Sequence, residues 1–255
     1  MTTRTHTAGS FCWFNLLTPQ AAAAREFFAA LLGWTYTEMP GVGHTVQVAD
    51  VEIGTLFDLS ASGALDATPP HVGVTLRVDN TEAACRRVNA LGGRASPAFD
   101  LMDQGRMAVC VDPGGAEFDI WEPKQRQKSE FEGRVHGAPG WFELTTSDSE
   151  RTAVFYAGLF GWTSTSAGPS GSHYTLFNQG DTCVAGMSRN RSPMALPQAH
   201  WAAFFHVRDV ESTLRKALEL GATQSAPIVE VPGVGRFCRL TSPQGLEFRV
   251  MTCAG

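Results

Sequence analysis

The chain lacks the features that mark several large classes of protein. None of its apolar runs approaches the roughly 20 residues that a membrane helix needs, and its polar start, MTTRTHTAGS, has no apolar segment of the kind found in secretory signals. No stripe of Lys and Arg stands out in a chain of net charge −5, which argues against nucleic acid as a partner. The six cysteines form no Cys-x-x-Cys pair, so we expect reduced thiols. Together these absences predict a cytoplasmic protein that binds neither membrane nor nucleic acid.

The composition that remains is typical of folded domains. Hydrophobic residues make up 43% of the chain and charged residues only 18%, which is enough apolar material for a core and too little charge for disorder. A length of 255 residues allows one large domain or two of ordinary size.

The sequence repeats itself across its two halves. CWFNLLTPQAAAAREFFAALLGW at residues 12–34 aligns without a gap with GWFELTTSDSERTAVFYAGLFGW at residues 140–162. HVGVTLRVDNTEAACRRVNALGG and GRMAVCVDPGGAEFDIW likewise recur as HWAAFFHVRDVESTLRKALELGA and GRFCRLTSPQGLEFRVM. A polar stretch at 122–140 separates the halves. We therefore predict a first domain at 1–124, a linker at 125–139 and a second domain at 140–255.

Each half also repeats one order of elements. Apolar residues at helical spacing predict a helix that stops at Gly33, and Ser147 with Glu150 forms a capping-box pattern before the matching helix. A further helix from Asp209 is expected to bury Val210, Leu214 and Leu218. Alternating segments such as HVGVTLRV predict strands. The order strand, helix, several strands thus occurs four times, which predicts an α+β fold.

The segments FFAALLGW, FYAGLFGW and DPGGAEFDIW resemble the vicinal oxygen chelate superfamily, which includes glyoxalase I, bleomycin-resistance proteins and extradiol dioxygenases. In that superfamily a βαβββ module pairs with a second module, and their curved sheets surround a cavity. The resemblance covers nearly the whole chain. It implies two tandem glyoxalase-like domains of two modules each, similar to tandem members described as hydroxylases or glyoxalase-like proteins.

The resemblance also implies positions for a divalent metal, held by His, Gln or Glu on inward-facing strands. In this sequence those positions fall on Trp13, Gly73 and Asp119 in the first half, and on Trp141, Ala202 and Arg249 in the second. Trp and Gly side chains do not ligate metals, and Arg repels a cation. We therefore expect neither a metal nor another cofactor. The alternative is a displaced metal site built from Glu143, His200 and Glu247, or from the loop histidines His44 and His173.

Strand alternation predicts which side chains line the two cavities. The expected ligand-binding residues are Trp13, Asn15, His71 and Asp119 in the first half, and Trp141, His200 and Glu247 in the second. The tryptophans would stack a flat ligand. The alternative for them is core packing, and for the two histidines a surface position at a strand start.

Three residues of the second half suit catalysis. Glu143 and His206 are expected to act as base and acid, with Arg249 stabilising an anion. The alternative is a structural ion pair with Arg249. Three functions stay open, which also leaves open whether the protein is an enzyme. The first is binding of a small aromatic or carbonyl-bearing metabolite, with metal-independent acid–base catalysis. The second is sequestration of a drug or metabolite, as by a bleomycin-resistance protein. The third is the activity of a metal-dependent lyase/isomerase or dioxygenase. We expect a monomer or homodimer.

Overall fold

A computed structural model describes residues 7–60, 69–124, 134–167, 174–189 and 199–254. The first repeat contains β1 (Phe11–Thr18), α1 (Ala21–Leu32), β2 (Thr35–Met39), β3 (Gly43–Val48), β4 (Val51–Asp58), β5 (His71–Arg77), α2 (Thr81–Ala90), β6 (Arg94–Ala95), β7 (Phe99–Leu101), β8 (Gly105–Val111) and β9 (Glu117–Pro123). The second contains β10 (Pro139–Thr146), α3 (Ser149–Phe160), β11 (Thr163–Ala167), β12 (Tyr174–Gln179), β13 (Thr182–Arg189), β14 (His200–His206), α4 (Val210–Glu219), β15 (Thr223–Gln224), β16 (Val229–Val231), β17 (Gly235–Thr241) and β18 (Glu247–Cys253). The predicted α+β fold of four strand–helix–strand modules is confirmed. None of the described helices is long and apolar enough to cross a membrane.

The chain groups into two compact units that do not follow the order of the repeats. Unit 1 comprises Met1–Cys12, Val74–Lys128 and Trp141–Ala202, and unit 2 comprises Trp13–Gly73, Ser129–Gly140 and Ala203–Gly255. Each unit therefore takes one module from each repeat. The predicted boundaries at 124 and 140 describe the sequence repeat and stay a prediction as domain limits. Residues 125–133 of the predicted linker lie outside the described residues.

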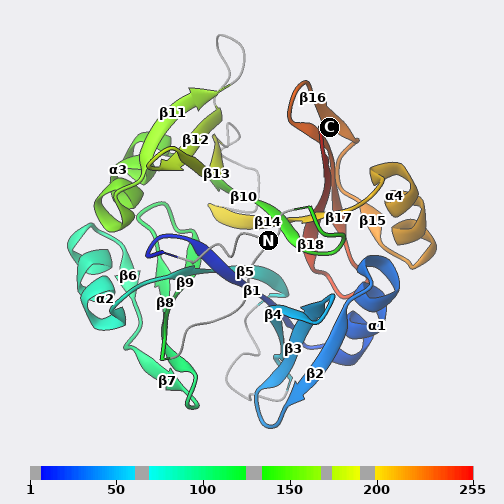
Figure 1. The fold of residues 1–255 in the computed structure, drawn as a ribbon, viewed down its shortest axis with the longest axis horizontal. Helices are drawn as coiled ribbons and strands as arrows, with labels where there is room; N and C mark the ends of the chain where they lie inside the picture. The colour runs from blue at the N-terminus through cyan, green and yellow to red at the C-terminus, as the bar shows by residue number, and fades with distance from the viewer. Residues whose placement is uncertain (1–6, 61–68, 125–133, 168–173, 190–198, 255) are drawn as a thin grey trace. The chain divides into compact units, whose positions relative to one another are not determined.

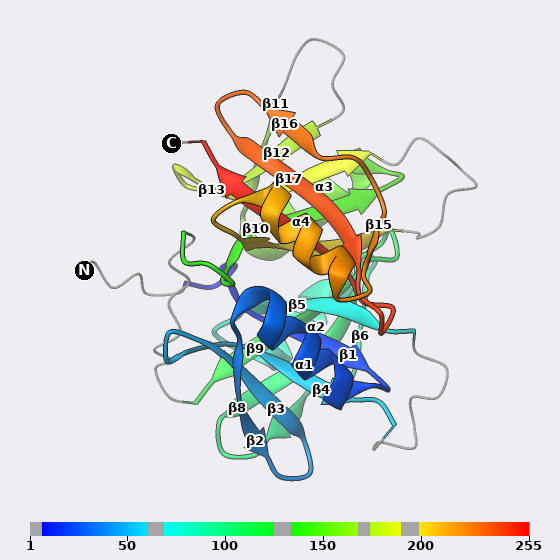
Figure 2. The ribbon, with the colours of Figure 1, turned by 90° about the vertical axis from the view of Figure 1, so that its right-hand side faces the viewer.

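Each unit contains two sets of hydrogen-bonded strands, one from each repeat, and each set packs against one helix. We call each set a half-sheet. In unit 1, one has the order β5-β9-β8, with β6 and β7 on β8, and the other the order β11-β12-β13-β10. In unit 2, the orders are β2-β3-β4-β1 and β14-β18-β17, with β15 and β16 on β17. The helices α2 and α3 contact each other in unit 1, as α1 and α4 do in unit 2 (Figure 1). Figure 2 shows α4 lying across β17, which it contacts.

Aromatic side chains fill both cores. In unit 1, the Phe11 and Phe142 rings stack with centroids 4.1 Å apart. In unit 2, Phe28 of α1 meets Phe248 of β18 edge-on at 5.1 Å. Buried aromatic pairs add specific geometry to a large apolar area. The strand residues that alternate with the predicted cavity-lining ones, such as Leu144 beside Glu143, are buried.

Two local predictions about the helices are wrong. The N-cap of α3 is Asp148 rather than Ser147, and its carboxylate accepts the Arg151 backbone N–H at 3.1 Å. Along α4 the buried residues are Val210, Thr213 and Ala217, whereas Leu218 is 45% exposed. Thr213 tolerates burial because its hydroxyl donates to the Asp209 carbonyl at 2.7 Å, so its polar atom is satisfied within the helix.

A one-residue bulge recurs at the same place in both repeats. Gly137, with φ of 87°, donates its N–H to the His206 carbonyl at 2.7 Å, and the His206 N–H donates to the Ala138 carbonyl at 2.8 Å. In the first repeat Gly9, with φ of 86°, donates to the Arg77 carbonyl at 2.8 Å. This pattern is a G1 bulge, in which two residues oppose one and the first needs a positive φ. The bulge fixes the end of β14 at His206 and the end of β5 at Arg77.

Candidate functional site

In unit 1, one face of the half-sheet β11-β12-β13-β10 carries several polar and aromatic side chains. Glu143 pairs with Gly186, and Ser188 pairs with Tyr174, so these residues share a face. Trp141 joins them because residues two apart on a strand point the same way. Helix α3 covers the other face, where Phe177 packs against Tyr156. We call this set, Trp141, Glu143, Tyr174, Gly186 and Ser188, the Trp141 face.

The members of the Trp141 face contact one another. The Trp141 indole N–H donates to the Tyr174 hydroxyl at 3.2 Å, and the Ser188 hydroxyl donates to a Glu143 carboxylate oxygen at 3.5 Å. A Cβ on Gly186 would overlap the Tyr174 hydroxyl. The missing side chain of Gly186 therefore makes room for the phenol beside the indole. Trp141, Glu143 and Tyr174 are all half-buried, so this face is neither core nor open surface.

The equivalent face in unit 2 has other polar partners. The Trp13 indole donates to the Thr55 hydroxyl at 2.7 Å, and Thr55 pairs with Asn15 as Gly186 pairs with Glu143. Trp13 is half-buried, whereas Asn15 is only 4% exposed. The two tryptophans hold matching positions, but the acceptor of the indole N–H differs between them.

Asp119, the remaining acidic candidate of the first half, lies on the second half-sheet of unit 1. It pairs with Thr75 of β5 and Val109 of β8. The Cys12 thiol donates to the Thr75 carbonyl at 3.6 Å. Burial raises the pKa of Cys12 to about 12, an effect that the Arg77 cation opposes and the Asp119 carboxylate reinforces. This thiol therefore stays protonated near neutral pH and offers no thiolate nucleophile.

In unit 2, His206 and Arg249 share the face of β14 and β18. Arg249 pairs with Phe204, and its guanidinium carbon lies 4.9 Å from the centre of that ring. Arg249 is only 2% exposed, so this cation–π contact is enclosed. Burial lowers the pKa of His206, the Arg134 cation lowers it further, and a hydrogen bond with the Val207 backbone opposes both. His206 is thus poised to be neutral near pH 7.

Other predicted residues have structural contacts. His71 and His200 are the first residues of β5 and β14, and an imidazole nitrogen of His71 lies 3.0 Å from the Pro69 carbonyl. Glu247 forms an ion pair with Arg239 at 3.6 Å. Both histidines are half-buried at their strand starts, and their role in ligand binding stays a prediction.

The predicted catalytic residues are divided between the units. Glu143 lies in unit 1, whereas His206 and Arg249 lie in unit 2. Their grouping into one catalytic site therefore stays a prediction. Tyr174, Thr55 and Ser188 were not predicted from the sequence. Tyr174 and Ser188 have no counterpart of the same type in the first repeat, so the repeat itself could not reveal them.

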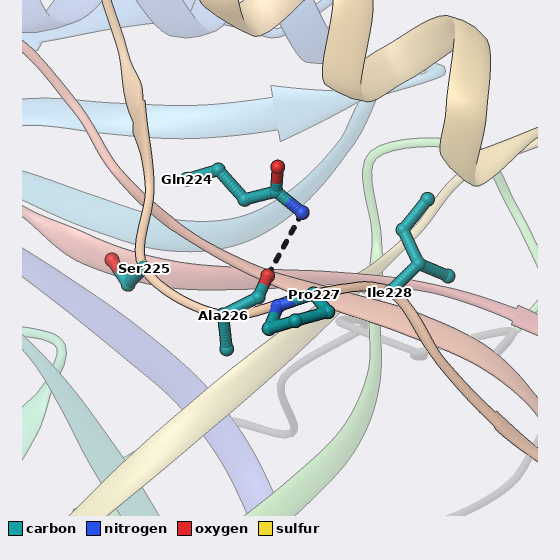
Figure 3. Close-up of a pocket in the computed structure, with 5 residues that line it drawn as sticks. All are labelled: Gln224, Ser225, Ala226, Pro227 and Ile228. Atoms are coloured by element: carbon teal, nitrogen blue, oxygen red, sulfur yellow. Dashed lines mark hydrogen bonds between the residues drawn. The ribbon is translucent and has the colours of Figure 1, made fainter.

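A hollow of about 460 Å³ lies elsewhere, along the segment that joins β15 to β16. It is lined by Gln224, Ser225, Ala226, Pro227 and Ile228, none of them a predicted site residue (Figure 3). The Gln224 amide turns back to donate to the Ala226 carbonyl at 2.9 Å. A single segment without a charged side chain provides little to orient a ligand.

The side chains present do not fit the divalent metal that the fold family implies. The positions expected to hold it are occupied by Trp13, Gly73, Trp141, Ala202 and Arg249, of which none offers an ordinary ligand. Among the described residues, no three His, Cys, Asp or Glu side chains gather in a way that could hold an ion. Asp119 alone has the donor type for a metal.

The chain belongs to the glyoxalase-like domain family, whose model matches it twice, at residues 13–121 and 141–251. Among its relatives, the CFP32 protein of Mycobacterium tuberculosis, whose name includes the word glyoxylase, is 31% identical over 94% of this chain and 93% of its own length. The anthracycline biosynthesis protein DnrV of Streptomyces peucetius is 32% identical over 95% of this chain and 93% of its own.

Solved structures of low identity share the fold. The Mn(II)-bound glyoxalase of Novosphingobium aromaticivorans aligns with a TM-score of 0.65 and 12% identity over 96% of this chain and 82% of its own. The 2,3-dioxygenase LapB of Pseudomonas sp. KL28 aligns with a TM-score of 0.64 and 11% identity over 100% of this chain and 94% of its own. These likenesses confirm the vicinal oxygen chelate fold, which hosts more than one chemistry.

Proposed function

We propose that the chain binds a planar, carbonyl-bearing aromatic metabolite against the Trp141 face, where Glu143 acts as a general base without a metal. The observation that carries this proposal is the Trp141–Tyr174 hydrogen bond of 3.2 Å beside the Glu143 carboxylate. Flat rings stack on indole and phenol side chains. A carboxylate on the same face is placed to accept a proton from a ring hydroxyl or an activated carbon.

The relatives support this class of ligand. DauV of Streptomyces sp. (strain C5), like DnrV, is named for anthracycline biosynthesis and is 32% identical to this chain. Anthracyclines are planar ring systems that carry quinone carbonyls and phenolic hydroxyls, which combine a stacking surface with acidic protons. The aromatic and acidic side chains of the Trp141 face match both features.

His206 and Arg249 are secondary candidates in this proposal. Arg249 is enclosed against Phe204, so a ligand would have to displace that contact before an anion reached the guanidinium. Lewis-acid chemistry is not part of the proposal, because the donor types at the implied metal positions do not fit an ion. Elemental analysis showing one tightly held divalent metal per chain would contradict this part.

Fluorescence titration with the dihydroxyanthraquinone quinizarin tests the binding site. We expect quinizarin to quench tryptophan emission, and Trp141→Ala to weaken its affinity by about tenfold, the scale of one lost ring-stacking contact. The matched control is Trp13→Ala on the equivalent face of unit 2. Equal affinity of both variants and the wild type would refute the assignment to the Trp141 face.

The second candidate function is sequestration without turnover, which is favoured because the described side chains at the implied metal positions do not fit an ion. Incubation of quinizarin with the protein, followed by liquid chromatography and mass spectrometry of the extracted compound, separates the two. A product with a changed retention time, isomers of unchanged mass included, that disappears in Glu143→Gln, with Asn15→Ala as the control, supports catalysis. Activity that survives Glu143→Gln but not Asn15→Ala would place the reaction on the other face.

A further inference from the structure

A cluster of positive side chains surrounds the G1 bulge of the second repeat, apart from the Trp141 face. The bulge pins the His206 backbone between Gly137 and Ala138, so His136 lies next to the end of β14. The pKa of His136 is lowered by burial and by the Arg208, His206 and Lys216 charges, while Arg134 lies close enough to His206 to lower its pKa. We call Arg134, His136, His206, Arg208 and Lys216 the bulge cluster. All five belong to unit 2.

At the equivalent bulge of the first repeat, the positive charge is neutralised by a carboxylate. There Arg77 occupies the position of His206, and Asp79 occupies that of Arg208. The Arg77 guanidinium and the Asp79 carboxylate form an ion pair at 3.2 Å. The second repeat has reversed the charge at the second position. Among the described residues, no carboxylate forms an ion pair with Arg208 or its neighbours in the bulge cluster.

The acidic residue next to Arg208 in the sequence already has another structural role. Asp209 follows Arg208, but its carboxylate caps α4 by accepting the Ser212 backbone N–H at 2.7 Å. Arg215 and Arg236 also lie close enough to lower its pKa. On the strand beside His206, the paired residue is Met251, which carries no charge. Within the part of the chain that the structure describes, the bulge cluster therefore has more positive than negative side chains, although the net charge of the chain is −5.

Both imidazoles of the bulge cluster have a buried ring nitrogen that lacks a hydrogen-bond partner among the described residues, Nδ1 in His136 and Nε2 in His206. A neutral ring tolerates this state as an unused acceptor, but a protonated ring would bury an N–H without an acceptor. An oxyanion beside the rings would supply the missing counter-charge, and it would supply the acceptor as well once each ring turned its enclosed nitrogen toward it.

We propose that the bulge cluster binds a dianionic oxyanion group, phosphate or sulfate, and that protons enter the two histidines as it binds. The guanidinium groups of Arg134 and Arg208 suit the oxygens of such a group, and Lys216 adds a point charge. The ligand is thus a phosphorylated or sulfated molecule, or the free ion itself. This site is independent of the aromatic ligand proposed for the Trp141 face.

Isothermal titration with sodium sulfate tests the proposal, because the charge of sulfate does not change between about pH 6 and pH 8, where histidines titrate. We expect sulfate to bind about tenfold more tightly at the lower pH, with proton uptake seen as a dependence of the heat on the buffer. Acetate, with one charge, should bind at least about tenfold more weakly than sulfate. Inorganic phosphate should match the affinity of sulfate at about pH 8, where phosphate too is mostly a dianion.

Substitutions in the bulge cluster, with one control outside it, decide whether the cluster is responsible. Arg208→Asp rebuilds the charge found in the first repeat and should abolish sulfate binding, whereas Arg151→Asp on α3 makes the same change of net charge and should leave it intact. His136→Gln should reduce the dependence on pH. Far-UV circular dichroism checks folding, and Arg208→Gln replaces Arg208→Asp if the latter unfolds. Absence of sulfate binding by the wild type, equal binding of acetate, or full binding by the Arg208 variant would each overturn the proposal.

Discussion

Tyr156→Phe should destabilise the protein although it removes a single oxygen atom. The Tyr156 hydroxyl, fully buried in unit 1, accepts the Trp201 indole N–H at 2.8 Å and donates to the Asp112 carboxylate at 3.4 Å. Without it, Trp201 keeps a buried N–H with no acceptor, which costs about 1–3 kcal/mol. Asp112 loses less, since its other oxygen accepts the Gly114 and Ala116 N–H groups at 2.8 and 2.9 Å. We therefore expect a loss of about 1–3 kcal/mol in the free energy of unfolding.

Urea denaturation followed by circular dichroism measures this loss, and a double-mutant cycle assigns it. Trp201→Phe removes the donor, so adding Tyr156→Phe to it should cost at least about 1 kcal/mol less than in the wild type. The first repeat has an apolar version of the same place, with Phe28 for the tyrosine and Val72 for the tryptophan. If Tyr156→Phe is neutral, or if the two losses simply add, the hydrogen bond is not the source of the effect.

Two further predictions concern backbone and charge. Gly137→Ala should cost at least about 1 kcal/mol more than Gly41→Ala in urea denaturation, because both positions have positive φ but a Cβ on Gly137 would also lie 2.6 Å from the Leu32 carbonyl oxygen; equal losses would contradict this. Burial raises the pKa of Asp112 above 3.8, against the hydrogen bonds it accepts, so the folded state binds that proton more tightly than the unfolded state. The free energy of unfolding of the wild type, relative to that of Asp112→Asn, should then fall as pH rises from 3.8 through the raised pKa. Urea denaturation at a series of pH values measures this difference, and a difference that does not change with pH would refute the prediction.

The fold was predictable because its signals are repeated and local. The Gly-Trp that follows α1 also follows α3, so the end of each of these helices had an internal check. The grouping into compact units was not predictable. Sequence similarity shows which modules are copies of each other, but it does not show which modules pack together. Packing depends on contacts between apolar faces, such as that of Phe28 in the first repeat with Phe248 in the second.

The candidate site was predictable only in part. Strand alternation correctly separated Trp141 and Glu143 from the buried Phe142 and Leu144. It could not show that Tyr174 reaches Trp141, because that contact joins residues 33 positions apart and depends on a glycine on a third strand. Alternation gives the direction of a side chain, but hydrogen-bond partners depend on the register between strands.

Differences between the repeats occur as matched sets rather than as single changes. Where Thr55 accepts the Trp13 N–H in unit 2, unit 1 has Gly186, and the space left by its missing side chain lets the Tyr174 hydroxyl accept the Trp141 N–H instead. Either change alone would clash or leave the indole without its acceptor. Such compensated exchanges keep the scaffold intact while changing what it presents: a hydroxyl beside Asn15 on one face, and a phenol beside Glu143 on the other. Only the second combination places a carboxylate beside the paired indole and phenol, so we expect the two faces of the duplicated fold to take different ligands.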